Sequence, residues 1–219
     1  MLIEQPPALY RLLFRRATWR MPTLELTGRK TVYLTFDDGP IPIVTPWVLE
    51  QLRTRGIRAT FFMVGDNVYK YPHVYQQVID AGHEVGNHTH HHLHGLLFRT
   101  KNYVEDALEA HDLIQSSLFR PPNGHMRLRQ SLSIAKYFDT IMWDVVTRDY
   151  SNLVTPQQVL HNVKQYTRDG SIIVFHDSIK AWEKLTYALP RALDWLIGEG
   201  YVFQTISEGL RIKERANRR

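Results

Sequence analysis

Two adjacent carboxylates follow an apolar run near the start of the chain. Residues 31–36 are rich in β-branched and aromatic side chains, which predicts a buried strand, and Gly39 with Pro40 predicts a turn that ends it. Asp37 and Asp38 therefore lie at the carboxyl end of a strand, where α/β folds place their active sites. Taken by itself, Asp-Asp-Gly-Pro is better explained as a plain turn, because these residue types favour turns for steric reasons. A catalytic role needs further reactive side chains nearby.

A histidine-rich segment at residues 87–94 provides such side chains. The chain contains 11 His and no Cys, so disulfides and thiolate sites are excluded and any metal must be held by His, Asp or Glu. His88 and His92 are four residues apart, so a helical turn would place both imidazoles on one side. With Asp38 they would form a set of two imidazoles and one carboxylate that leaves positions open for water and substrate. Zinc is the first choice of metal.

The same segment leaves other interpretations open. His90, His91 and His94 offer rival pairs of ligands. An isolated histidine-rich segment can also bind metal adventitiously, or simply form a solvated loop. The choice of His88 and His92 therefore depends on support from elsewhere in the chain.

The order of the predicted elements indicates an α/β fold. Strand-like and helix-like runs alternate about seven times with short connections, which favours parallel strands joined by crossover helices. The strand-like runs are residues 31–36, 58–64, 83–86, 140–143, 171–175 and 201–205. Helices are predicted from Thr45 to a stop at Gly56, over 68–81, 103–114 and 128–137, from Thr155 to Gly170, and over 184–198.

The polar candidates share a position relative to these strands. Each falls just after a strand, and in a closed β/α barrel such positions share one rim. The candidates are Asp37, Asp38, the histidine segment, Arg120, Asp149 and His176. Their common placement is the strongest physical indication of a single site.

Bulk composition indicates one globular domain. The chain has 219 residues, of which 43% are hydrophobic and 22% charged, and no linker, low-complexity run or repeat divides it. We expect an N-terminal extension at 1–30 that packs on the barrel, a main domain at 31–207 and a basic tail at 208–219. We also expect a monomer.

The basic charge balance is concentrated at the two ends of the chain. The net charge of +5 and the pI near 9.4 are compatible with attraction to nucleic acid, anionic lipid or an acidic polymer. Solvated tails explain the excess better, and no basic stripe with interleaved aromatics is present, so we expect no nucleic-acid partner. The terminal cations include Arg11, Arg15, Arg16, Arg20, Arg211, Lys213, Arg215, Arg218 and Arg219.

We also expect neither a membrane-spanning segment nor an export signal. No segment approaches the run of about 18 to 20 apolar residues that a membrane span needs, so we expect no transmembrane helix. Residues 1–22 lack an uninterrupted apolar stretch with a cleavage site, which predicts a cytoplasmic location, with the cell envelope as the alternative. Residues 9–19 could lie on a membrane surface as a basic amphipathic helix, although packing on the barrel explains them better.

Five segments resemble, in order and spacing, the motifs of the polysaccharide deacetylases, the NodB-homology carbohydrate esterases. They are residues 35–40 (TFDDGP), 88–92 (HTHHH), 120–124 (RPPNG), 149–150 (DY) and 174–176 (VFH). The similarity runs from about residue 31 to 205. It implies a distorted (β/α) barrel, typically of seven parallel strands, and removal of N-acetyl groups from N-acetylglucosamine units in peptidoglycan, chitin or related glycans.

The resemblance also implies a role for each residue. Asp38, His88 and His92 would hold a divalent metal, zinc first and cobalt or manganese as alternatives. Asp37 would be the general base, held by Arg120. His176 would be the general acid, oriented by Asp149. These roles suit an amide, because a metal can polarise its carbonyl, a base can take a water proton and an acid can protonate the departing amine. A backbone N–H, which we assign to Asn123, would stabilise the oxyanion.

Several positions depart from the family pattern and leave the substrate open. Asn123 stands where Tyr or Phe is common, and Tyr150 where Trp is usual. Lys180, Trp182 and Tyr187 could line a sugar groove, or the two aromatics could cover the bottom of the barrel. A small or cyclic amide substrate, and a non-catalytic glycan-binding relative, are the alternative functions.

Overall fold

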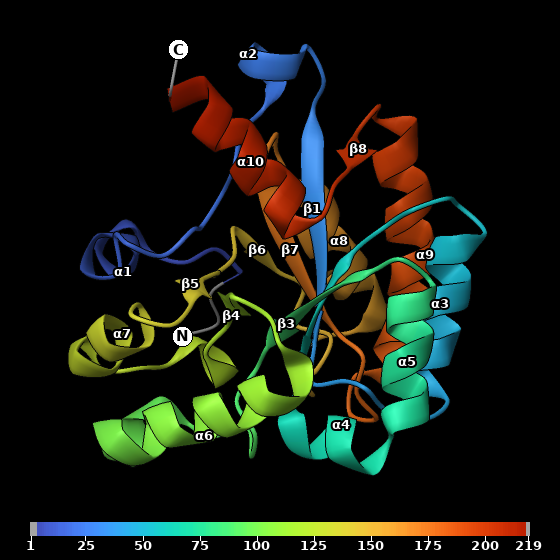
Figure 1. Cartoon of the computed structure of the whole chain (residues 1–219). Helices are drawn as coiled ribbons and strands as arrows, with labels where there is room; N and C mark the ends of the chain where they lie inside the picture. Colours follow the sequence, from blue (N-terminus) through green and yellow to red (C-terminus); the bar gives the residue numbers. More distant parts are fainter. Residues whose placement is uncertain (1–3, 218–219) are drawn as a thin grey trace.

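A curled parallel sheet organises the chain, as the computed structural model shows for residues 4–217 (Figure 1). Its central strand, β1 (Thr31–Asp37), is buried along its whole length. β1 pairs in parallel with β7 (Ser171–His176) on one side and with β2 (Thr60–Met63) on the other. The sheet continues through β3 (Glu84–Asn87), β4 (Leu118–Phe119) and β5 (Asp139–Thr140) beyond β2, and through β6 (Val145–Val146) beyond β7.

This arrangement confirms the expected distorted barrel of about seven parallel strands. The strand order is β5-β4-β3-β2-β1-β7-β6, so β5 and β6 are the two ends of the curled sheet. A short additional strand, β8 (Val202–Phe203), pairs with the first two residues of β1. The barrel is therefore open between β5 and β6.

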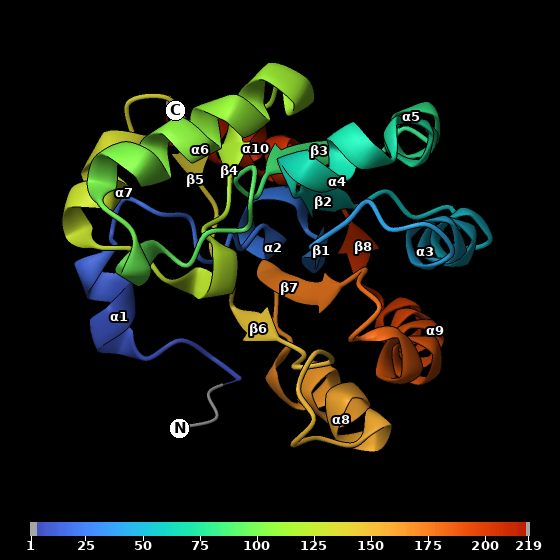
Figure 2. The same ribbon diagram turned by 90° about the horizontal axis from the view of Figure 1, so that it is seen from below.

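Helices surround the strands (Figure 2). The chain forms α3 (Val44–Arg53), α4 (Gly65–Lys70), α5 (Pro72–Asp80), α6 (Thr100–Ile114), α7 (Leu128–Ile134), α8 (Pro156–Tyr166) and α9 (Trp182–Gly198). Two single 3₁₀ turns, η1 (Gly95–Leu97) and η2 (Pro122–Gly124), lie in the loops after β3 and β4. The largest core cluster lies between the sheet and its helices, and the Phe36 ring at its centre stacks on the Phe61 ring with centroids 4.9 Å apart.

The local predictions hold where a capping residue or periodic pattern decides the structure. Thr155 caps α8 through a reciprocal pair of hydrogen bonds with Gln158, as its position before Pro156 predicts. The helix predicted over 68–81 is instead two helices, because Pro72 begins a new one. Thr45 does not cap α3, which begins at Val44, and its hydroxyl has another use described below.

The N-terminal segment lies across the open side of the barrel. Thr18 forms a bridge to Ile141, just after β5, and Arg20 forms one to Ser171 at the start of β7. The Arg11 guanidinium, on α1 (Ala8–Leu13), pairs with the buried Asp144 carboxylate at 2.8 Å. A one-turn helix, α2 (Leu24–Thr27), then leads to β1. Backbone pairing thus attaches this segment to the chain just after β5 and to the start of β7.

The C-terminal segment differs from the expected solvated tail. Residues from Ile206 to Asn217 form helix α10, which lies near α2 at the amino end of β1 (Figure 1). Ile206 is buried, and a Cβ added at Gly209 would lie 2.4 Å from the Tyr33 ring, so the helix packs closely on the sheet. Arg218 and Arg219 lie outside the described residues. Within residues 4–217, no helix combines the length and the apolarity that crossing a bilayer requires.

Candidate active site

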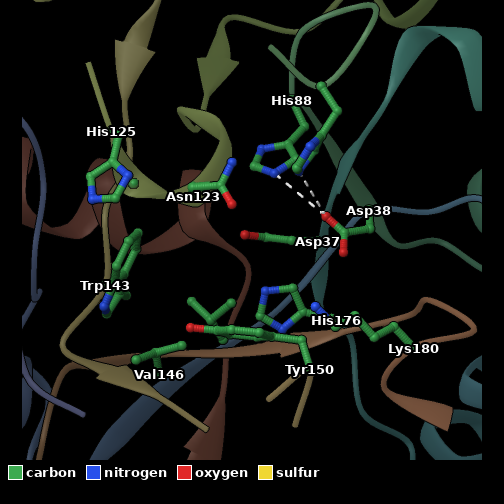
Figure 3. A pocket seen from close by; sticks show the side chains of 13 residues that line it. Asp37, Asp38, His88, Asn123, His125, Trp143, Val146, Tyr150, His176 and Lys180 are labelled. Carbon is green, nitrogen blue, oxygen red and sulfur yellow. Dashed lines mark ion pairs between the residues drawn. The ribbon is translucent and has the colours of Figure 1, made fainter. Parts of the chain in front are cut away.

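The register of the sheet places the first two candidates side by side. Asp37 is the last residue of β1, His176 is the last residue of β7, and the two are paired in register. Because neighbouring parallel strands end at the same edge, both side chains reach the same rim. Figure 3 shows Asp37 and His176 pointing into one pocket.

Arg120 holds the Asp37 carboxylate. Its Nη1 donates to Asp37 Oδ1 at 2.6 Å and to the Thr35 hydroxyl at 2.7 Å. Nε and Nη2 donate to the carbonyl oxygens of Ile141 and Met142 at 3.2 and 3.1 Å, and the guanidinium carbon lies 4.1 Å from the Phe62 ring centroid. Arg120 is fully buried, so this charge-assisted pair is screened from water and fixes the carboxylate in one orientation.

Asp38, His88 and His92 offer three ligand atoms to one point. Asp38 Oδ1 lies 3.2 Å from His92 Nε2 and 3.8 Å from His88 Nε2. Tetrahedral zinc with bonds of about 2.0–2.1 Å separates neighbouring ligand atoms by about 3.4 Å, so the observed spacing fits a divalent ion. Dashed lines in Figure 3 mark the two pairs.

The protonation chemistry of this set also suits a metal. Nδ1 of His88 faces the Arg120 carbonyl oxygen at 2.8 Å, which assigns the proton to Nδ1 and leaves the Nε2 lone pair toward Asp38. Burial lowers the pKa of His88 to about 4, so its imidazole is neutral at pH 7. Burial tends to raise the pKa of Asp38, but the hydrogen bond from His92 and the positive charge of His176 outweigh it and hold this pKa below its usual range.

The backbone conformation that brings His88 and His92 together differs from the expected helical turn. Thr89 and His92 have positive φ angles of 62° and 52°, so residues 88–92 form a loop with two left-handed residues. Asn87 Oδ1 accepts from the Thr89 amide at 2.8 Å, and the Thr89 hydroxyl accepts from the Leu93 amide at 3.1 Å. The loop still brings the His88 and His92 rings to a centroid distance of 5.1 Å.

Asp149 orients His176 on the opposite side of the pocket. Its Oδ1 lies 2.8 Å from His176 Nδ1, and its Oδ2 accepts from the His176 backbone amide at 2.8 Å. Burial by itself lowers the pKa of His176, but the Asp149 charge and hydrogen bond, with smaller effects of Asp38 and Asp37, raise it to about 9. His176 is therefore an imidazolium at pH 7 with Nε2 available as a proton donor.

The pocket has a volume of about 340 Å³ and is lined by Asp37, Asp38, His88, His92 and His176, whereas Arg120 and Asp149 do not line it. Asn123 lies across the pocket from Asp38 on η2, and its φ of 58° is left-handed, which Asn tolerates better than most residues. The Tyr150 ring packs edge-on against His176 at 4.7 Å. Lys180 lines the pocket as expected. Trp182 and Tyr187 do not, because both pack on the main core, and Trp182 lies edge-on against Trp47 at 5.4 Å.

The residue patterns did not indicate three residues around the pocket. Trp143, the last residue of a predicted strand, and His125, directly after a recognised motif, both line it, and those positions were the available signal. Asp177, next to His176, is fully buried beneath the turn that follows Asp38. Its carboxylate accepts from the Gly39 amide at 3.2 Å and pairs with the Thr45 hydroxyl at 2.5 Å.

A second cavity extends the pocket toward the N-terminal segment. It has a volume of about 410 Å³ and shares several lining residues with the first. Its far wall is formed by Pro6, Pro7, Tyr10 and Arg148. The shared residues are Asn123, Gly124, His125, Trp143, Val146 and Tyr150. The two cavities therefore form one continuous depression that is longer than a single amide group needs.

The half-barrel and the paired carboxylate and imidazole groups define a class of hydrolases. The sequence model of the polysaccharide deacetylases matches residues 25–140, and the chain belongs to this family. The carbohydrate esterase resemblance is thereby confirmed, and the chain is a hydrolase of the polysaccharide deacetylase type.

Individual relatives cover most of the chain. A peptidoglycan-N-acetylglucosamine deacetylase of Bacillus cereus is 36% identical over 205 residues, which cover 90% of this chain and 93% of the relative. A chitooligosaccharide deacetylase of Bradyrhizobium sp. is 30% identical over 168 residues, covering 73% and 76% of the two chains. The structure of the peptidoglycan deacetylase PdaC from Bacillus subtilis has a TM-score of 0.77 at 27% identity, with 86% of this chain and 94% of that chain covered.

Proposed function

We propose that this chain is a metal-dependent hydrolase that removes N-acetyl groups from N-acetylglucosamine units of a peptidoglycan- or chitin-like glycan. One observation carries the proposal: the Asp37 carboxylate, the His176 imidazolium and three side chains that could hold a metal ion face one another across a single pocket. A divalent ion bound by Asp38, His88 and His92 would polarise the amide carbonyl and make a nearby water more acidic.

Asp37 acts as the general base. It is excluded from the ligand set by its hydrogen bond to Arg120, and it faces the pocket beside Asp38. Its carboxylate takes a proton from the attacking water as the new C–O bond forms. Arg120 acts as a positioning residue, because it touches Asp37 and is itself fully buried.

His176 acts as the general acid. After water has added to the carbonyl carbon, the C–N bond breaks only if the departing nitrogen receives a proton, since an amide anion is a poor leaving group. His176 donates this proton from Nε2, and Asp149 stabilises the imidazolium through Nδ1. The products are acetate and a free amine on the sugar.

Asn123 stabilises the oxyanion that forms between these two steps. Its left-handed conformation on η2 places this residue on the wall of the pocket, and the backbone N–H is the donor that we assign to the developing charge. Losing one such donor typically costs about 10²–10³ in turnover.

The shape of the site supports a glycan as the substrate. The second cavity continues from the first, and Trp143, Tyr150 and Tyr10 provide ring faces along it. Aromatic rings suit the flat apolar faces of sugars. Relatives named for deacetylation of peptidoglycan and chitooligosaccharides support the same choice.

The decisive experiment measures acetate release by mass spectrometry from oligomers of N-acetylglucosamine and from a panel of small and cyclic amides. The zinc-loaded wild type should release acetate from the oligomers and leave the small amides intact. Asp37→Asn retains an acceptor for Arg120, so it should keep its metal and lose about 10²–10⁴ of turnover. Activity of Asp37→Asn equal to that of the wild type would show that Asp37 is not the base, and turnover of the small amides alone would reject a glycan substrate.

A further inference from the structure

A second group of metal-type ligands lies on the same loop, outside the pocket. His90 and His91 stand between the two pocket histidines, and Glu109 faces them from α6. One ligand atom from each of the three lies within 4.8 Å of the other two. Nε2 of His90 and Oε1 of Glu109 are 3.6 Å apart, close to the separation of about 3.4 Å expected between ligands of tetrahedral zinc. Neither histidine lines the pocket.

Asp106 holds these ligands in place from behind. Its Oδ1 lies 2.6 Å from Nδ1 of His91, which puts the proton on Nδ1 and leaves Nε2 free to bind a metal. Its Oδ2 accepts from the backbone amides of both His90 and His91, at 2.9 and 3.1 Å. A carboxylate behind a ligating imidazole is the usual support of a metal site, because it fixes the ring and raises its basicity.

The surroundings also favour a cation. His90 packs against Gly65, where an added Cβ would lie 2.6 Å from its ring, so the imidazole position is defined. Asp106 and Glu109 place two carboxylates around the two imidazoles, whereas the nearby Asp66 carboxylate is paired with Lys70. Glu109 and His91 are each 56% exposed, so an ion can reach them from solvent without any opening of the fold.

We propose that His90, His91 and Glu109 form a second binding site for zinc or a similar nitrogen-preferring divalent ion. Two imidazoles and a carboxylate are borderline ligands that suit zinc better than magnesium or calcium. His88 and His92 flank these two histidines in the sequence. An ion at the second site therefore links the loop that carries the pocket ligands to α6.

The test is the zinc stoichiometry of the full chain carrying no affinity tag. The protein is stripped with a chelator, dialysed against buffered zinc and measured by inductively coupled plasma mass spectrometry. Wild type should bind two equivalents, and His91→Ala and Glu109→Gln should each bind one. Glu105→Gln neutralises a carboxylate on the same helix that is 61% exposed and pairs with Lys101, so this matched control should still bind two.

A pocket variant separates this proposal from the proposed function. His92→Ala removes a proposed pocket ligand whose side chain is 38% exposed. This variant should still bind one equivalent of zinc at the second site. The double variant with His91→Ala should bind none. Retention of two equivalents by His91→Ala, or an equal loss in Glu105→Gln and Glu109→Gln, would overturn the second site. A single equivalent in wild type that is lost in His92→Ala would also overturn it, while leaving the pocket assignment intact.

Discussion

The most informative perturbation of the pocket is Asp149→Asn, which removes a charge and keeps the size of the side chain. In the wild type, the Asp149 carboxylate counteracts the effect of burial and raises the pKa of His176 from 6.5 to about 9. In the variant burial remains and the charge is lost, so the pKa of His176 should fall to its ordinary value or below. The general acid would then be deprotonated at neutral pH.

The size of the effect follows from the two pKa values. At pH 7.5 an acid with a pKa of about 9 is about 97% protonated, whereas one with a pKa near 6.5 is about 10% protonated. Activity that needs the imidazolium is lost as pH rises through the pKa of His176. The alkaline limb of kcat/KM should therefore move toward lower pH by about 2.5 units or more in Asp149→Asn.

The assay is acetate release from N-acetylglucosamine oligomers between pH 5.5 and 10, with metal content measured in parallel. Asp112→Asn neutralises an exposed carboxylate on α6 and should leave the alkaline limb unchanged. Because Asp149 also accepts from the backbone amide of His176, its replacement should cost about 1–3 kcal/mol of stability, so the melting temperature must be checked. An alkaline limb that stays in place in folded, metal-loaded Asp149→Asn would refute the assignment of His176 as the acid.

Three further predictions concern the metal, the turn and the groove. His92→Ala should lose the pocket metal and more than about 100-fold of activity, measured by metal analysis and turnover, and normal turnover at unchanged metal content would contradict the ligand assignment. Burial raises the pKa of Asp177 to about 8, so its carboxyl group is neutral at pH 7 and Asp177→Asn should fold normally. Asp177→Ala, in contrast, leaves the Gly39 amide and the Thr45 hydroxyl without their acceptor. The pKa of Asp177 in the folded protein exceeds the unfolded value of 3.8, so the wild type should lose stability relative to Asp177→Asn as pH rises from about 4 to about 8. Urea unfolding midpoints measured across this pH range check the prediction. Midpoints that change in parallel for the two proteins would contradict it. Trp143→Ala should raise KM for long oligomers by roughly fivefold, about 1 kcal/mol, and change KM for short ones less; equal effects on both would place Trp143 outside the groove.

Sequence patterns anticipated those parts of the fold that regular elements determine. Parallel strands in register end together, so residues that directly follow two strand-like runs, such as Asp37 and His176, could be brought to one rim without coordinates. The same reasoning extends to Arg120, which directly follows β4, whereas Asp149 lies in a turn beyond the end of β6. Periodicity and capping likewise predicted α8 from Thr155.

Local backbone geometry and long-range packing escaped the same reasoning. A spacing of four residues suggested a helical turn for His88 and His92, whereas positive φ angles at Thr89 and His92 produce the same convergence in a loop. From the sequence, Asp177 cannot be distinguished from any other residue that follows a strand. Its hydrogen-bond partners, Gly39 and Thr45, lie about 130 positions away in the sequence. The charged C-terminal segment resembled a solvated tail because its contact with the sheet depends on a small residue, Gly209, and on two apolar side chains, Ile206 and Leu210, among many charged ones.

Arg120 connects the two halves of the proposed chemistry. Its side chain fixes the Asp37 carboxylate, and its backbone carbonyl accepts from Nδ1 of His88 and so sets the tautomer of a metal ligand. A rotation of this residue would therefore disturb the base and the ligand set together. Fully buried arginine is costly unless its donors are satisfied, and here Thr35, Ile141 and Met142 accept three hydrogen bonds besides the one to Asp37. The burial of a cation beneath the pocket is thus explained by positioning: one rigid residue holds Asp37, the proposed base, in place while orienting His88, a proposed metal ligand.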